Sequence, residues 1–245
     1  MTEPSTRRVT LVTGGARRVG AAIVRSFASP NDAIVLHHGN SPDAADALAK
    51  ELREQGTLVH VVRADLADAN APAFIVDEAM RVFGALDVVV SSASVMEWQA
   101  FGEVTPETWD SASNINLRAP FFLMQAAARV MRDGGVIIQM SDHLAHETLF
   151  PNLIPHQVTK AALTQLVRTV ASAVAPRLRV NAVAPGLVLA PEDLSAEALE
   201  RFLRDVPLGH SGTPDDVTKA IHYLLSATYV TGTVLSVDGG RHLWR

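Results

Sequence analysis

Residues Thr13–Gly20 read TGGARRVG and stand between a short apolar run, Val9–Val12, and a stretch of helical period that begins near Val19. Glycines at a turn from strand to helix let the backbone approach a pyrophosphate. The N-terminus of the helix adds free N–H groups and a positive potential that attract the anion. The stretch therefore predicts a dinucleotide-binding turn, within which we expect contacts from Gly14, Arg17, Arg18, Val19 and Gly20.

Outward from this turn, short apolar runs alternate with longer stretches of helical period, the order typical of a parallel sheet with crossover helices. Seven runs are candidate strands: Val9–Val12, Ala33–His37, Leu58–Arg63, Leu86–Val90, Val136–Met140, Leu178–Ala184 and Val234–Val237. Helical stretches begin near Val19, Asp43, Ala71, Pro106, Ala119, His156 and Pro214. No repeat or low-complexity linker interrupts them. We predict an α/β fold, a single doubly wound Rossmann domain over residues 1–245 with a seven-stranded parallel sheet.

Residues 187–212, after the sixth strand, break this rhythm with a proline-flanked acidic stretch and a short helix. Open α/β sheets bind ligands at the carboxyl ends of their strands. We therefore expect this segment to cover the substrate crevice.

The chain has 245 residues, of which 48% are hydrophobic and 19% charged, a formal net charge of -5 and no cysteine. This composition excludes a disordered chain, disulfides and thiolate nucleophiles, and the acidic balance argues against a nucleic-acid binder. No apolar run reaches the roughly 18 residues of a membrane helix. The polar stretch Met1–Arg8 leaves no room for a signal peptide. We expect a cytoplasmic protein with a small-molecule substrate and neither a nucleic-acid nor a membrane partner.

The choice of nucleotide is suggested by charge. A guanidinium binds phosphate in a bidentate way, whereas a ribose diol needs a carboxylate acceptor. The turn carries Arg17 and Arg18, and the second strand ends in residues 37–41, HHGNS, without Asp or Glu. This pattern favours NADPH over NADH. The alternative is that both arginines are solvated surface charges.

At this point the sequence resembles the short-chain dehydrogenase/reductase family over nearly its whole length. Arg18 stands where the middle glycine of the family motif usually lies, a change similar to the NADPH-dependent pteridine reductase and dihydromonapterin reductase branch. The resemblance implies that Arg18 and Ser41 bind the 2′-phosphate, with His37 and Asn40 beside them, and that Asp65 and Leu66 touch the adenine. For Asp65 a helix cap is an equal alternative.

The resemblance also places residues after later strands. After the fourth strand, Ser92, Ala93 and Ser94 would contact the cofactor, and Ser94 the substrate as well. Met96 occupies the position of an aromatic ring that stacks on the pterin in the branch, and Trp98 follows it; we expect both to contact substrate. After the sixth strand, Pro185, Gly186 and Leu187 match the turn that passes the nicotinamide, although a plain strand-ending turn fits Pro-Gly equally.

The reaction centre departs from the family pattern. Asp142 stands where the catalytic serine normally lies, as in the pteridine branch, while His156 replaces the tyrosine and Lys160 is retained. We predict catalytic roles for Asp142, His156, Lys160 and Asn116, with Asp142 and His156 also binding substrate. The resemblance implies that Lys160 also binds the cofactor, through its ribose. Asn116 matches the asparagine that supports a water linked to the lysine; the alternative is a bond to the helix backbone. A carboxylate beside His156 favours the imidazolium, from which a histidine donates a proton.

These features predict an NADPH-dependent reductase that transfers hydride to a C=N bond, of a dihydropterin or a similar planar imine. The alternatives are a carbonyl or imine reductase of a specialised metabolite, and a nucleotide-binding member whose redox chemistry was lost or changed with the tyrosine. The resemblance implies a homotetramer. His143, His146 and His156 do not have the convergent spacing of zinc ligands, so we predict no metal.

Overall fold

The computed structural model describes residues 7–146, 150–190 and 195–243. Part of the predicted covering segment, residues 191–194, lies outside these ranges, as do the closing residues Trp244 and Arg245. Seven strands form one parallel sheet in the order β3-β2-β1-β4-β5-β6-β7, which confirms the predicted fold class. The strands are β1 (Arg8–Thr13), β2 (Asp32–His38), β3 (Leu58–Arg63), β4 (Val88–Ser91), β5 (Val136–Met140), β6 (Arg179–Pro185) and β7 (Val234–Val237).

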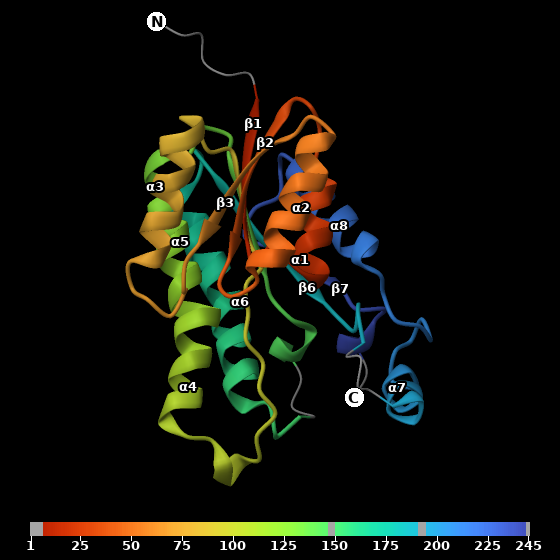
Figure 1. Cartoon of the computed structure of the whole chain (residues 1–245). Helices are drawn as coiled ribbons and strands as arrows, with labels where there is room; N and C mark the ends of the chain where they lie inside the picture. The colour runs from red at the N-terminus through yellow and green to blue at the C-terminus, as the bar shows by residue number, and fades with distance from the viewer. Residues whose placement is uncertain (1–6, 147–149, 191–194, 244–245) are drawn as a thin grey trace, which may run out of the picture.

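Helices cover both faces of this sheet (Figure 1). On one face lie α3 (Ala71–Phe83), α5 (Ala119–Val130) and α6 (Ile154–Val174), and on the other α1 (Arg18–Ser26), α2 (Pro42–Glu54) and α8 (Pro214–Ser226). Successive side chains of a strand point to opposite faces. Accordingly, Leu11 belongs to the core under α3 and α5, while Val12 belongs to the core under α1 and α8. Burial on both faces explains why the strands read as continuous apolar runs.

Prolines mark the helix starts. Each of α2, α3, α4 (Pro106–Ser113), α5, α6 and α8 has a proline in its first turn, where the missing N–H has no helical partner to lose. The predicted starts are correct to within two residues; the largest shift is in α6, which begins at Ile154 because Pro155 initiates it. Sequence reasoning missed the π-helical turn η2 (Asn114–Arg118) between α4 and α5.

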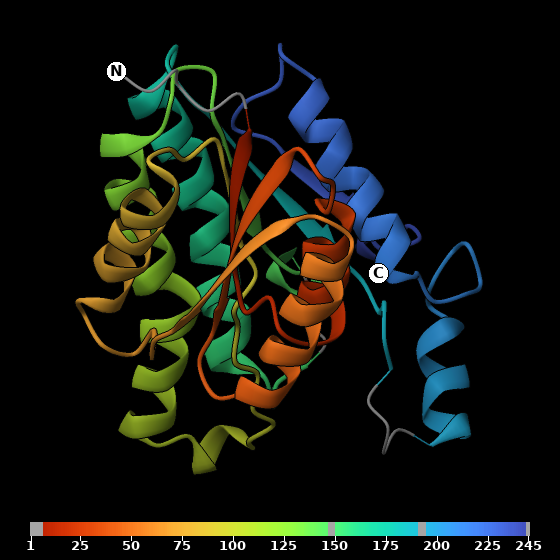
Figure 2. The same ribbon diagram turned by 45° about the horizontal axis from the view of Figure 1, so that its top comes forward.

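The remaining helix, α7 (Ala196–Leu203), is the short helix expected within residues 187–212. Figure 2 shows it standing apart from the two helical layers. A hydrogen bond from the Gly212 N–H to the Leu187 carbonyl (2.9 Å) closes the base of this segment. Within the described ranges, no helix is long and apolar enough to cross a bilayer.

Candidate active site

A polar cavity of about 1090 Å³ lies at the carboxyl ends of β1, β2, β3 and β4. Its walls include thirteen of the residues expected to bind the cofactor: Gly14, Arg17, Arg18, Val19, Gly20, His37, Asn40, Ser41, Asp65, Leu66, Ser92, Ala93 and Ser94. Sequence reasoning missed Arg63, which also lines it. Its signal was available in the strand order, because Arg63 ends β3 as the register partner of His38 at the end of β2.

The glycine turn keeps side chains out of this cavity. Gly14 has a φ of +64°, and a Cβ there would lie 2.8 Å from the Ala93 Cα; a Cβ on Gly20 would lie 2.0 Å from the Gly14 oxygen. Arg18 also has a positive φ, 51°, at the position where the family motif has a glycine. The bare backbone, the start of α1 and the neighbouring arginines together fit a dinucleotide.

His37 lines the cavity but has an internal task. Its Nδ1 accepts a hydrogen bond from the Gly14 N–H (3.2 Å), and its Nε2 donates to the Ala64 carbonyl (3.0 Å). Burial lowers the pKa of His37 to about 4. The ring is therefore neutral near pH 7 and joins the glycine turn to the end of β3, while the predicted contact of His37 with the cofactor stays a prediction.

The polar cavity is also lined by three arginines, by Ser41 and by Asp65. Arg17, Arg18 and Arg63 supply positive charge, and Ser41 sits at the N-cap of α2 with a hydroxyl that makes no capping bond. The Asp65 carboxylate accepts a hydrogen bond from the Ala67 N–H (2.9 Å), so it stabilises the turn after β3 while lining the cavity. The cap proposed for Asp65 thus belongs to this turn, since α3 begins only at Ala71.

A second, apolar cavity of about 680 Å³ adjoins the first, sharing Arg18 and Val19. The expected substrate residues Met96, Trp98 and Asp142 line it, and so do Pro185, Gly186 and Leu187. Sequence reasoning missed its two other aromatic residues, Phe150 and Phe202. Phe150 meets Trp98 edge-on, with ring centroids 6.0 Å apart, so aromatic surface is present although Met96 is not aromatic.

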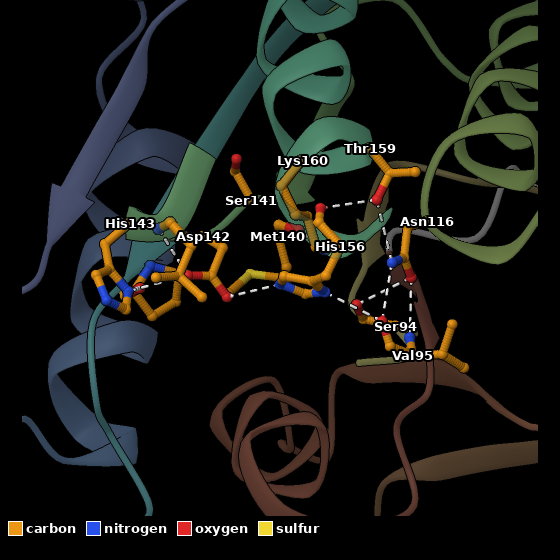
Figure 3. A network of polar contacts seen from close by, with 12 residues as sticks. Ser94, Val95, Asn116, Met140, Ser141, Asp142, His143, His156, Thr159 and Lys160 are labelled. Atoms are coloured by element: carbon orange, nitrogen blue, oxygen red, sulfur yellow. Dashed lines mark hydrogen bonds and ion pairs between the residues drawn. The ribbon is translucent and has the colours of Figure 1, made fainter. Parts of the chain in front are cut away.

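Of the predicted reaction centre, Asp142 lines this apolar cavity, and Asn116, His156 and Lys160 do not. The polar contacts of Asp142 are drawn in Figure 3. Its Oδ1 accepts hydrogen bonds from the Leu144 N–H (2.9 Å) and from His143 Nδ1 (2.9 Å), and its Oδ2 accepts one from His156 Nε2 (3.1 Å). Burial acts to raise the pKa of Asp142, but the bonds from His143 and His156 outweigh it and hold that pKa well below its ordinary value. Asp142 is therefore ionised at neutral pH.

The neighbouring Ser141 points elsewhere. Its hydroxyl hydrogen-bonds to the Thr164 hydroxyl (3.1 Å) in the interior. The alignment of Asp142, and not Ser141, with the usual catalytic serine thus agrees with the direction of both side chains.

His156 lies behind Asp142. The residue is 4% exposed. The described residues around the apolar cavity include Asp142 but not His156, so direct contact between His156 and substrate is not supported. Its Nε2 faces the carboxylate and its Nδ1 faces the Val95 carbonyl at 3.0 Å. Two acceptors satisfy both ring nitrogens only when the ring carries two protons.

Lys160 and Asn116 complete the network in Figure 3. Lys160 Nζ donates to the Met140 carbonyl (2.7 Å), and burial lowers the pKa of Lys160 to about 8. Asn116 accepts hydrogen bonds from the Ser94 hydroxyl (3.0 Å) and the Val95 N–H (2.8 Å), and donates to the Val95 carbonyl (2.9 Å). These contacts replace the bond to the helix backbone that was the alternative for Asn116. The side chain holds residues 94–95, and the Val95 carbonyl in turn hydrogen-bonds to His156.

The chain has no tyrosine in this region. Its two tyrosines are Tyr223 in α8 and Tyr229, which are 55% and 103% exposed on other parts of the surface. Among the described residues, no group of three or more histidine, aspartate or glutamate side chains is placed to hold a metal ion.

The chain is similar to known proteins over nearly its whole length. A family model described as enoyl-(acyl carrier protein) reductase matches residues 14–242. L-rhamnose 1-dehydrogenase (NAD(P)(+)) of Azotobacter vinelandii is 36% identical over 248 residues, covering 95% of this chain and 96% of that protein.

Two solved structures have the same fold. A short-chain dehydrogenase/reductase from Serratia marcescens is 33% identical with a TM-score of 0.91, covering 98% of this chain and 100% of that one. FolM alternative dihydrofolate reductase 1 from Brucella canis, complexed with NADP, is 30% identical with a TM-score of 0.90, covering 99% and 97%. The chain therefore belongs to the short-chain dehydrogenase/reductase family, as an NAD(P)-dependent oxidoreductase.

Proposed function

We propose that this protein is an NADPH-dependent reductase of a C=N bond in a planar nitrogen heterocycle, such as a dihydropterin. The observation that carries the proposal is the ionised Asp142 in a mostly apolar cavity that adjoins the cofactor cavity. Beyond its bonds from His143, His156 and the Leu144 N–H, the carboxylate has acceptor capacity left toward the cavity. A protonated ring nitrogen or an N–H group of the substrate would donate a further hydrogen bond to it. The printed name of the Brucella canis neighbour, a dihydrofolate reductase, supports the same class of substrate.

The walls of the apolar cavity suit a flat ring. Trp98, Phe150 and Phe202 offer aromatic surface, and Met96 offers a polarisable thioether that packs on ring edges. Pro185, Gly186 and Leu187, the turn expected to pass the nicotinamide, also line the apolar cavity, so the substrate would meet the nicotinamide there. The ring would therefore lie between the aromatic side chains and the cofactor, with its nitrogen toward Asp142.

The Asp142–His156 pair can move one proton. When bound, NADPH supplies the hydride that reaches the carbon of the C=N bond. The nitrogen then needs a proton unless it already carries one, and the His156 Nε2 proton, held 3.1 Å from Asp142 Oδ2, can pass through the carboxylate to it. The C=N bond becomes CH–NH, and the ring of His156 becomes neutral. Asn116 maintains the Val95 carbonyl that faces the other ring nitrogen.

The preference for NADPH is proposed on the positive charge of Arg17, Arg18 and Arg63 and on the absence of an acidic residue from residues 37–41 at the end of β2. The bound NADP of the Brucella canis neighbour supports it. The homotetramer and the cytoplasmic location remain predictions; sedimentation velocity tests the first.

NADPH oxidation by the purified protein tests this function. Dihydrobiopterin and dihydromonapterin would be compared with a simple cyclic imine and with an aliphatic and an aromatic ketone, each with NADPH and NADH. Turnover of a dihydropterin or a cyclic imine with NADPH supports the proposal. Turnover of ketones alone would assign a carbonyl reductase, and saturable NADPH binding with no turnover of any compound would favour a nucleotide-binding role.

A further inference from the structure

Arg241, near the end of the chain, is buried although the two residues after it are exposed. It begins the short turn η4 (Arg241–Leu243), whose backbone is held by Asp238: the Asp238 carbonyl accepts the Arg241 N–H (3.2 Å), and the Asp238 carboxylate accepts the His242 N–H (2.8 Å). Arg241 Nη1 lies 2.8 Å from Asp205 Oδ2. The guanidinium of Arg241 therefore points from a well-held turn into the interior of the protein, where it pairs with Asp205.

The same guanidinium stacks over Phe202, 5.1 Å from the ring centroid. Phe202 in turn meets the His143 ring edge-on, with centroids 6.0 Å apart and an interplanar angle of 89°. His143 Nδ1 lies 2.9 Å from Asp142 Oδ1 and 3.1 Å from the Pro185 carbonyl. Arg241, Phe202, His143 and Asp142 therefore form one continuous series of contacts, which we name the anchor column.

The helix that carries Phe202 has few other attachments. None of the residues of α7 is buried, so its own packing holds it weakly. An arginine suits the task of anchoring such a helix because its planar group can pair with a carboxylate and stack on an aromatic ring at once. Removing the guanidinium would leave Asp205 without this partner and Phe202 without one side of its stack.

We propose that Arg241 is a positioning residue: it fixes α7 over the apolar cavity through Asp205 and Phe202 and, through Phe202 and His143, orients the Asp142 carboxylate toward substrate. The effect on turnover rests on the proposed function, whereas the anchoring of α7 does not. Arg241 itself lines neither cavity, so the cofactor cavity is expected to be indifferent to it.

The test compares Arg241→Gln with Arg204→Gln, a matched change of an exposed arginine just after α7. In Arg241→Gln we expect kcat for the substrate found above to fall by on the order of tenfold to a hundredfold, with the Kd for NADPH within about twofold of the parent. Arg241→Lys, which keeps the charge near Asp205 but not the stacked plane, should recover part of the loss. Arg204→Gln should leave both kcat and the Kd for NADPH unchanged.

A second measurement needs no substrate. Trypsin cleavage after Arg201 and Arg204, both exposed, should accelerate in Arg241→Gln relative to cleavage after the exposed Lys50 of α2, and NADPH should not reverse the difference. Faster cleavage with no turnover of any compound in the parent would leave the anchor standing and remove the proposed function. Cleavage at the parental ratio, or an equal loss of kcat in Arg204→Gln, would overturn the proposal.

Discussion

The polar and apolar cavities meet at Arg18 and Val19, but they are built differently. The walls of the polar cavity are mostly residues that directly follow β1, β2, β3 and β4, so the sheet itself places them. The apolar cavity combines residues 96–98, 142–144 and 150–153 with the segment around α7, which meet through side-chain contacts between loops. The cofactor end of the site thus follows from topology, and the substrate end from long-range packing. Asp142→Asn and Gly20→Ala should each affect one cavity and spare the other.

The largest effect is expected from Asp142→Asn. The amide cannot carry the charge that balances His156, nor relay its proton, so kcat for the imine substrate should fall by on the order of a hundredfold or more. The Kd for NADPH should hardly change, because Asp142 does not line the polar cavity.

Ser141→Ala is the matched control for Asp142→Asn, since Ser141 is adjacent but bonded to Thr164 in the interior. It should retain most of the turnover even if it lowers the unfolding midpoint. An equal loss of kcat in both variants would mean that the whole strand end, and not the carboxylate, is responsible.

Gly20→Ala should distort the glycine turn that lines the polar cavity and weaken cofactor binding. A Cβ there would lie 2.0 Å from the Gly14 oxygen, a backbone atom that cannot move without displacing the turn. We expect the Kd for NADPH to rise by on the order of a hundredfold, equivalent to about 3 kcal/mol. Gly102→Ala, where a Cβ meets nothing within 4 Å, should bind NADPH as the parent does. Fluorescence titration of NADPH would measure both, and unchanged affinity in Gly20→Ala would show that the turn is not the binding surface.

Arg18→Gly tests a residue that lines both cavities, through its effects on cofactor preference and on stability. On the proposed role of Arg18 as a ligand of the 2′-phosphate, losing its guanidinium should reduce the preference for NADPH over NADH by about tenfold. Because Arg18 has a φ of 51°, glycine removes an unfavourable backbone conformation, and the free energy of unfolding should not fall despite the lost bond to the Leu189 carbonyl (2.6 Å).

Arg17→Gly is its control, because Arg17 has a φ of -140°, where glycine brings no relief. It should lower the free energy of unfolding slightly. A fall of that quantity in Arg18→Gly but not in Arg17→Gly would contradict the argument from backbone conformation.

The smallest effect concerns His37 and pH. Its folded pKa, about 4, lies below the ordinary 6.5, so between these values the unfolded chain binds more protons than the folded one. The contribution of His37 to stability is present above pH 6.5 and is lost as pH falls toward 4. In His37→Gln the slope of the unfolding free energy against pH in this window should be shallower, by at most about 1.4 kcal/mol per pH unit. Urea unfolding at several pH values measures this, and an unchanged slope would mean that the ring titrates normally in the folded chain.

Much of the cofactor cavity could be predicted from the sequence because its residues lie at strand ends that hydrophobic periodicity locates. The order of the strands and helices was enough to predict that Gly14, Ser41 and Ser92 lie near one another. The partners of His37 could not be predicted, because the fit of a buried ring between Gly14 and Ala64 depends on the spacing of three strands. Arg63 was missed since its proximity to His38 follows from strand register and not from a local motif.

In the reaction centre, the family motifs identified Asp142, His156 and Lys160 as a group. They did not show which of the three lines the apolar cavity and which lie behind it. That His156 lies behind Asp142, bonded to Val95, results from the way Asn116 holds residues 94–95 against α6. The aromatic wall formed by Phe150 and Phe202 could not be predicted either, because neither residue belongs to a motif. Phe150 reaches the cavity from a loop and Phe202 from α7.

By itself, then, the sequence determined the doubly wound sheet, the glycine turn and the acidic, tyrosine-free reaction centre, since these depend on local periodicity and on which residue types are present. Only the tertiary structure decided which side chains face substrate, which ring nitrogens are already engaged, and how Arg241 reaches α7. The physical reason is that hydrogen bonds and packing between loops depend on the relative placement of segments far apart in the chain.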